Sequence, residues 1–125
     1  MEKGHGTLGI IACGIAYNYV KEAMGDGANV LKVSQYPLPE EAIRQLASEN
    51  SSVIVMEDGQ PVVEQQVKAL LGAGYDVKGR LTGDLPRTGE LTPDNVAKAL
   101  GAGEKEIMAP SEVVAPRPPQ LCQGC

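Results

Sequence analysis

The chain has 125 residues and a formal net charge of −5, with 16 acidic side chains against 11 basic ones. This length suits one domain with a core that is stable without disulfides or metal, and leaves no room for a second full domain. The acidic balance argues against phosphate-backbone binding, and the absence of Phe and Trp disfavours stacking on single-stranded nucleic acid. We therefore expect a globular domain with no nucleic-acid partner.

Membrane insertion and secretion are equally disfavoured. The longest apolar stretch, residues 8–16, is too short and too rich in glycine to cross a bilayer, and no convincing cleavage site accompanies it. Three cysteines, an odd number, fit a reducing compartment better than a disulfide framework. The sequence predicts a cytoplasmic protein without a membrane partner.

The first half of the chain alternates strand and helix patterns. Residues 7–13 form a continuous apolar run, as expected of a parallel strand covered on both faces, and they place Cys13 in the core as a small hydrophobe. A helix is predicted from Ala16 to Met24, because apolar residues recur there every three or four positions until a glycine pair ends the pattern. Residues 29–34 predict the second strand.

The pattern then repeats. A helix is predicted to start with Pro39 in its first turn, and residues 52–56 predict the third strand. Pro61 starts the next helix, which is expected to carry an exposed pair of Glu64 and Lys68 on its outer face.

A short strand and a final helix complete the predicted fold. Residues 75–78 form the strand, and Thr92 caps the helix. Alternating strands and helices imply right-handed crossovers and a mostly parallel sheet with helices on both faces, so the predicted fold class is a three-layer α/β/α sandwich. Proline and glycine then replace any periodicity, which predicts a domain over residues 1–103 and a proline-rich linker over 104–125.

The chain ends with a Cys-x-x-Cys pair, Cys122 and Cys125. Two nearby thiols suit metal binding or redox exchange, but a tetrahedral metal or an iron-sulfur cluster normally requires four ligands. A redox pair belongs at a strand-to-helix turn, whereas this pair follows a linker, so an inert pair is the favoured interpretation. His5, the one histidine, lies in a glycine-rich segment and is a poor candidate for a general base.

Two further groups of charged residues have alternative interpretations. Glu57 and Asp58 follow the third predicted strand, at the edge where α/β sheets usually bind ligands. They would contact a ligand hydroxyl or a neighbouring domain. Alternatively, they are acidic residues at the start of the next helix, where the helix dipole stabilises negative charge. Lys78, Arg80 and Arg87 flank a loop that would bind an anion, pack on a partner or remain solvated.

Four segments together resemble the alpha subunit of the indolepyruvate:ferredoxin oxidoreductases, a thiamine-diphosphate-dependent family. They are residues 8–20, 36–39, 85–93 and 117–125. The resemblance covers essentially the whole chain but only one internal part of such a subunit, a module similar to the transketolase C-terminal domain. It implies a parent that decarboxylates arylpyruvates and passes electrons to ferredoxin while forming an acyl-CoA.

The resemblance also implies that the chemistry belongs to other modules. Thiamine diphosphate, Mg and [4Fe-4S] clusters would bind elsewhere in the parent, leaving this region with no catalytic residue, no cofactor of its own and no activity alone. Cys122 and Cys125 are the only metal-ligand candidates, and only in the full-length parent. The implied partners are the other domains of the subunit, a beta subunit and ferredoxin, with a possible homodimer.

Our hypothesis from sequence is therefore a structural and assembly domain of such an alpha subunit. One alternative is a free-standing metal or redox module in which Cys13 and His5 complete a ligand set with Cys122 and Cys125. Another is a regulatory domain that binds a small ligand at the strand ends near Gly14, Ser34 and Glu57.

Overall fold

The computed structural model describes residues 1–103 and residue 113. It contains one sheet of four strands in the order β2-β1-β3-β4, and all neighbouring strands are parallel. The strands are β1 (Leu8–Cys13), β2 (Asn29–Val33), β3 (Ser52–Met56) and β4 (Val77–Lys78). The helices are α1 (Ala16–Met24), α2 (Glu40–Glu49), α3 (Val62–Leu71) and α4 (Pro93–Ala99).

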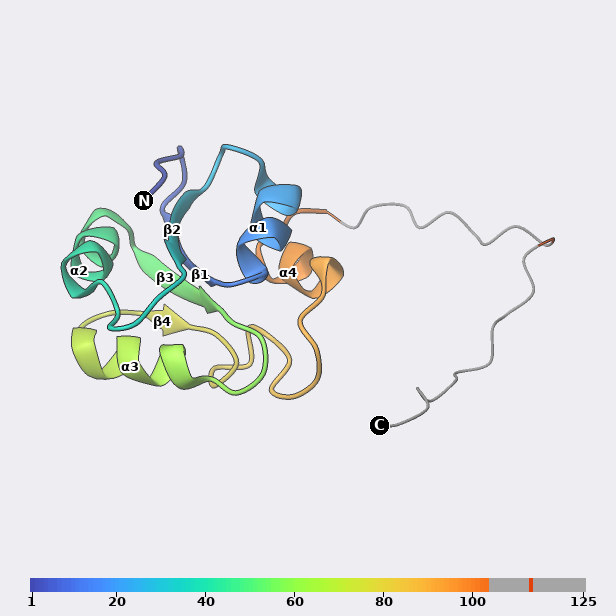
Figure 1. Cartoon of the computed structure of the whole chain (residues 1–125). Coiled ribbons are helices and arrows are strands. Elements are labelled where there is room, and N and C mark those ends of the chain that lie inside the picture. The colour runs from blue at the N-terminus through green and yellow to red at the C-terminus, as the bar shows by residue number, and fades with distance from the viewer. Residues whose placement is uncertain (104–112, 114–125) are drawn as a thin grey trace.

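Helices cover both faces of the sheet (Figure 1). Helices α1 and α4 pack together on one face, and α2 and α3 lie on the other. Each face of the sheet packs in its own hydrophobic core, and successive residues of β1 point to opposite faces. Ile10 and Ala12 face α1 and α4, whereas Ile11 faces α2 and α3. The three-layer α/β sandwich predicted from sequence is therefore confirmed, while the closer likeness to a transketolase C-terminal domain stays a prediction.

Strand β1 is central, and its Ile10 lies beside Val30 of β2 and Ile54 of β3. The outer edge of β2 receives a single antiparallel bridge from the N-terminal segment, between Glu2 and Val30. The sheet is thus parallel throughout its four strands and gains one antiparallel contact at this edge.

Two helix starts differ by one residue from the prediction. Pro39 and Pro61 precede α2 and α3 as cap residues instead of occupying the first helical position. Their φ angles of −76° and −77° suit a helix, but their ψ angles of 79° and 61° do not, so the helical backbone begins only at the next residue. The short strand is also narrower than 75–78, because only Val77 and Lys78 pair with β3.

The last helix begins as the sequence indicates. The Thr92 hydroxyl accepts a hydrogen bond from the Asn95 backbone N–H at 3.2 Å, and Pro93 occupies the first turn. Over residues 1–103, the helices are all too short or too polar to traverse a bilayer. The boundary predicted near residue 103 remains a prediction, because the linker lies outside the described residues except for Val113.

Candidate functional site at the carboxyl edge of the sheet

Three of the predicted ligand-binding positions lie at one edge of the sheet. Gly14 follows β1, Ser34 follows β2 and Glu57 follows β3, and the carboxyl ends of parallel strands meet at the same edge. The loop after β4 brings Arg80 to the same edge. The structure therefore brings together the acidic pair and part of the basic loop that the sequence analysis treated separately.

Glu57 caps the start of α3. It is 5% exposed, and its two carboxylate oxygens accept hydrogen bonds from the backbone N–H groups of Val63 (2.9 Å) and Glu64 (2.8 Å). These are among the N–H groups that have no partner within a helix, and a carboxylate there also complements the helix dipole. The dipole interpretation of Glu57 is confirmed, because both oxygens are engaged by the helix.

Arg80 is the largest fully buried side chain of the described residues, with 2% of its surface exposed. Its Nε donates to the backbone carbonyl of Glu57 at 3.0 Å, and its Nη1 donates to that of Pro86 at 2.6 Å. A solvated Arg80 was one of the predicted alternatives and is wrong. The guanidinium instead links the end of β3 to the 79–91 loop and satisfies carbonyl groups that burial removes from water.

Asp58 holds the far end of the same loop. Its Oδ1 accepts hydrogen bonds from the backbone N–H groups of Gly59 (3.0 Å) and Leu91 (2.9 Å), and it lies 3.6 Å from Nη2 of Arg80. Leu91 is 1% exposed and packs in the core beneath α1 and α4. Asp58 and Arg80 thus position the loop that delivers Leu91 to the core.

Glu64 is a site residue that the sequence analysis misplaced. The predicted pair with Lys68 exists at 2.7 Å, but Glu64 is 1% exposed and its Oε2 accepts the N–H of Leu81 at 3.0 Å. Gly79 also lies against the Glu64 carboxylate, because a Cβ added at Gly79 would lie 2.5 Å from Oε2 of Glu64. The glycine at 79 was the available signal, because close approach of a side chain to the backbone requires a residue without Cβ.

Cys13 is a half-buried free thiol at the end of β1, in contact with the core on the α2 and α3 side. Burial, followed by the negative charge of Glu57, raises the pKa of Cys13 to about 12. The thiol is therefore protonated at neutral pH and is a poor nucleophile and metal ligand.

The metal-ligand set of the alternative hypothesis is not brought together by the described residues. His5 is exposed and precedes β1, whereas Cys13 ends it, and the six-residue strand between them spans about 16 Å. Within residues 1–103, no three His, Cys, Asp or Glu side chains group closely enough to hold a metal ion. Cys122 and Cys125 lie outside the described residues, so their role stays a prediction.

Apolar side chains surround this edge on its exposed side. Ile15 (49% exposed) follows β1, Tyr36 (65%) follows β2, Val62 (48%) follows β3 and Leu81 (40%) follows β4. Each of these residues follows the carboxyl end of a strand, so all four lie on the side of the sheet where the parallel strands end. The Glu57 carboxylate and Nε and Nη1 of Arg80 bond to backbone at this edge, whereas Nη2 of Arg80 is buried without a hydrogen-bond partner among the described residues and lies 3.6 Å from Asp58 Oδ1. These four apolar side chains are exposed beside them.

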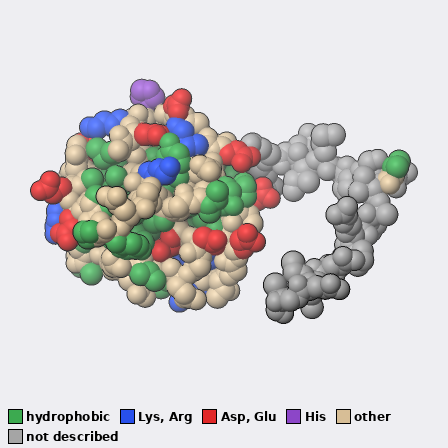
Figure 2. Space-filling view, in the orientation of Figure 1, with side chains coloured by type: hydrophobic (Ala, Val, Ile, Leu, Met, Phe, Trp, Pro, Cys, Tyr) green, Lys and Arg blue, Asp and Glu red, His purple; other side chains and the backbone are tan. Residues whose placement is uncertain are grey.

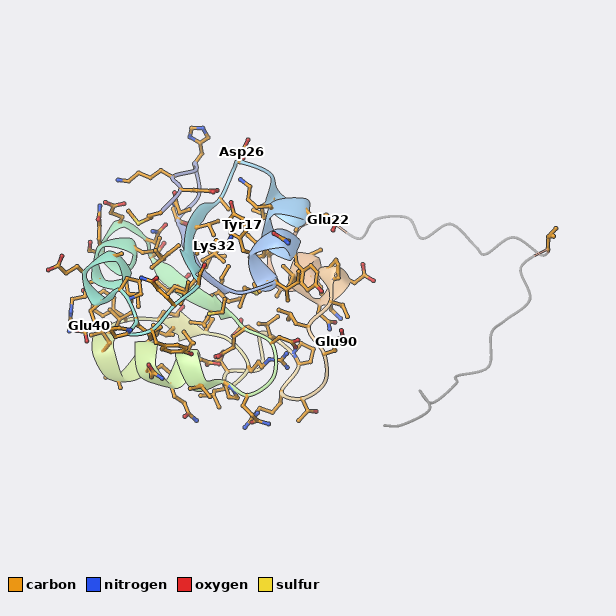
Figure 3. All side chains as sticks on the ribbon, viewed as in Figure 1. Tyr17, Glu22, Asp26, Lys32, Glu40 and Glu90 are labelled. Atoms are coloured by element: carbon orange, nitrogen blue, oxygen red, sulfur yellow. The ribbon has the colours of Figure 1, made fainter. Side chains whose placement is uncertain are left out.

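Acidic and basic side chains are interspersed over α1 and the N-terminal segment (Figure 2). Glu2 contacts the Tyr17 hydroxyl and lies 3.0 Å from Lys21, and these two hydrogen bonds lower the pKa of Glu2. Lys32 from β2 lies 4.5 Å from the centre of the Tyr17 ring, and the two side chains are neighbours in Figure 3. This face is therefore a mixed charge network, and no basic surface for a polyanion forms there.

Comparisons with known proteins give one consistent result. The chain is 40% identical to the indolepyruvate oxidoreductase subunit IorA of Archaeoglobus fulgidus, over all of this chain and 22% of that protein. It is 36% identical to the IorA of Methanothermobacter thermautotrophicus and 34% identical to that of Pyrococcus abyssi, in each case over 94% of this chain and 21% of the relative. The chain thus spans about a fifth of the length of the curated relatives it matches. No family model and no solved structure matches it.

Proposed function

The chain belongs to the family of indolepyruvate oxidoreductase subunit IorA, as one region of such a subunit, and from that premise we propose that it is a structural and assembly domain. The observation that carries the proposal is the set of exposed apolar residues at the carboxyl edge, Ile15, Tyr36, Val62 and Leu81. They lie at the same edge as the Glu57 carboxylate and Arg80 Nε, which already bond to backbone. Apolar residues gathered on one surface favour packing against other protein.

The partners of this edge are the other domains of the alpha subunit. Interfaces between domains of one chain are smaller and more polar than obligate ones, and an apolar centre with charged surroundings agrees with that pattern. Asp58, Asp84 and Glu90 provide exposed charge around the edge. We assign contacts with the beta subunit, with ferredoxin and with a second copy of the subunit to the assembled full-length parent.

The full-length parent oxidatively decarboxylates arylpyruvates to acyl-CoA and gives the electrons to ferredoxin, using thiamine diphosphate, Mg and [4Fe-4S] clusters. We assign the steps of this reaction to the other domains of the parent; within residues 1–103, no three His, Cys, Asp or Glu side chains group closely enough to hold a metal ion. The domain contributes the rigid edge against which the catalytic domains are positioned, a role that affects rate through geometry. A cytoplasmic location agrees with this role.

The test uses the purified chain and a full-length subunit that contains this region. The chain is expected to show no saturable binding of thiamine diphosphate with Mg and no turnover of indolepyruvate. In the full-length complex, a double replacement of Ile15→Asp and Leu81→Asp is expected to reduce assembly and turnover while leaving the stability of the isolated chain nearly unchanged, because both side chains are exposed.

The matched control is Tyr75→Asp, since Tyr75 is similarly exposed (44%) but precedes β4 and so lies at the opposite edge. Normal assembly of the double variant, or an equal defect in Tyr75→Asp, would contradict the proposed edge. Turnover by the isolated chain would contradict the assignment of chemistry to other domains.

A further inference from the structure

The outer edge of β2 begins an antiparallel pairing. Glu2 and Val30 exchange both backbone hydrogen bonds, with distances of 2.7 Å from Glu2 N to Val30 O and 2.9 Å from Val30 N to Glu2 O. A pair that exchanges both bonds recurs at every second residue of an antiparallel ladder. The backbone N–H and C=O of Lys32, two residues after Val30, therefore point outward as well.

The backbone carbonyl of Val33, the residue after Lys32, points to the opposite side of β2, as this alternation requires. The carbonyl of Val33 accepts a hydrogen bond from the N–H of Gly14, which follows β1 on the inner side of β2. Lys32 thus presents its backbone groups outward, and within residues 1–103 they have no backbone partner on that side; Ser34 directly follows the end of β2. Outward groups of this kind are a template for another strand.

The space beside these groups is open. A depression of about 330 Å³ is lined by residues 31–35 together with Pro37 and Pro39. The depression therefore follows the part of β2 that Glu2 does not cover. Strand addition of this kind derives affinity from main-chain hydrogen bonds and specificity from alternate side chains.

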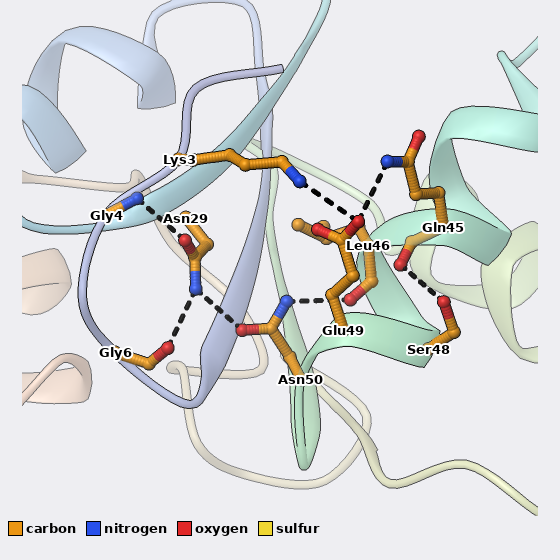
Figure 4. Close-up of polar contacts among 9 residues, drawn as sticks. All are labelled: Lys3, Gly4, Gly6, Asn29, Gln45, Leu46, Ser48, Glu49 and Asn50. Atoms are coloured by element: carbon orange, nitrogen blue, oxygen red, sulfur yellow. Dashed lines mark hydrogen bonds and ion pairs between the residues drawn. The ribbon is translucent and has the colours of Figure 1, made fainter.

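The N-terminal segment is held firmly in the direction that such a strand requires (Figure 4). The amide of Asn29 accepts the N–H of Gly4 at 2.7 Å and donates to the carbonyl of Gly6 at 2.8 Å. A Cβ at Gly4 would lie 2.2 Å from the carbonyl oxygen of Gly27, so the segment lies tightly on the turn before β2. Lys3 adds an ion pair with Glu49 at 3.1 Å.

We propose that the outer edge of β2 at Lys32 and Ser34 is a docking site for an extended strand, occupied by the segment that leads into Met1 in a full-length IorA subunit. The proposal rests on the proposed function as a domain of a longer subunit, since the chain spans only 21–22% of its relatives. The antiparallel direction fixed at Glu2 carries such a segment along β2 toward Ser34. A contiguous strand also avoids the entropic cost of closing a loop.

The register of the pairing is fixed by the Glu2 bridge. The residue immediately before Met1 exchanges two hydrogen bonds with Lys32, and the third residue before Met1 does so with Ser34. The second residue before Met1 lies opposite Val33, and its N–H points away from β2. A proline is therefore tolerated at the second position but not at the first.

Hydrogen exchange of backbone amides tests this register. The chain is compared with a version extended by the six residues that, under this proposal, lead into Met1 in a full-length IorA subunit. The amides of Lys32 and Ser34 are expected to exchange about tenfold more slowly or better in the extended chain, because each gains a hydrogen bond. The amide of Leu31, which points toward β1, is the internal control and should not change.

Two proline variants of the extended chain complete the test. Proline immediately before Met1 should return the Lys32 amide to fast exchange, and proline at the second position before Met1 should not. Unchanged exchange on extension, or equal effects of the two prolines, would overturn the proposal. Slow exchange in the unextended chain that disappears on dilution would also overturn it, because a second copy would then occupy the edge. The proposed function is judged separately, by assembly and turnover of the full-length complex.

Discussion

Replacing Arg80 with alanine tests whether the buried guanidinium fixes the carboxyl edge. The side chain is 2% exposed and donates to two backbone carbonyls, those of Glu57 and Pro86. Truncation removes both donors and leaves the two carbonyls with no partner from this side chain. It also separates the 79–91 loop from the end of β3.

The expected loss follows from these two bonds. A hydrogen bond to a charged group contributes about 1.5–3 kcal/mol, so losing two predicts a decrease of about 3–6 kcal/mol in the free energy of unfolding. Typical stabilities of small domains are about 5–15 kcal/mol, so this loss is a large share of the total and the variant should unfold at much lower urea. The slope of unfolding free energy against urea should stay near its original value, because the buried surface is nearly the same.

Urea unfolding of the purified chain, followed by far-ultraviolet circular dichroism, measures this loss. Arg87→Ala is the matched control, because Arg87 lies in the same loop but is exposed, and its replacement should change stability by no more than about 0.5 kcal/mol. If Arg80→Ala is as stable as the control, the guanidinium does not hold the loop and our account of the edge is incorrect.

Three other perturbations address neighbouring parts of the structure. Gly79→Ala should lower thermal stability, by about 1–3 kcal/mol at the midpoint, because its Cβ would press on the Glu64 carboxylate, whereas Gly74→Ala meets nothing within 4 Å and should have little effect. Thr92→Ala should destabilise the chain by about 1 kcal/mol in the same thermal scan, and an unchanged midpoint would mean that the cap is not needed. The Cys13 thiol, with its pKa raised to about 12, should be alkylated slowly at pH 8, with a rate that still rises between pH 9 and pH 11 when followed by peptide mapping. An alkylation rate that levels off below pH 9 would contradict the burial of the Cys13 thiol. Because the raised pKa favours the protonated thiol of the folded chain, the contribution of Cys13 to stability is complete below the unfolded pKa near 8.5. That contribution is lost as pH rises toward 12.

Local patterns were sufficient for the order and type of the elements. The continuous apolar run in residues 8–13 and the helical spacing from Ala16 to Met24 depend only on neighbours along the chain, and the structure contains both elements. The Thr92 cap is similarly local, since donor and acceptor are three residues apart. The family was also evident from short segments, because their joint occurrence is specific.

Long-range contacts decided what the sequence pattern left open. Whether Arg80 is solvated or buried depends on carbonyls at Glu57 and Pro86, and the first of these is 23 residues away. Glu64 fits the outer face of a helix by spacing, yet the turn that follows β4 closes over it and supplies the N–H of Leu81. The spacing of apolar residues along α3 cannot predict this contact, because the N–H of Leu81 lies beside Glu64 only once β4 has paired with the sheet.

The sequence by itself determined an acidic α/β domain, its alternating elements and its relation to IorA. Only the tertiary structure decided that its charged edge residues are tied to backbone, that apolar side chains point outward beside them, and that β2 keeps an open edge beyond Glu2. The physical reason is that periodicity reports which face of an element is buried, whereas hydrogen-bond partners are set by how the elements meet.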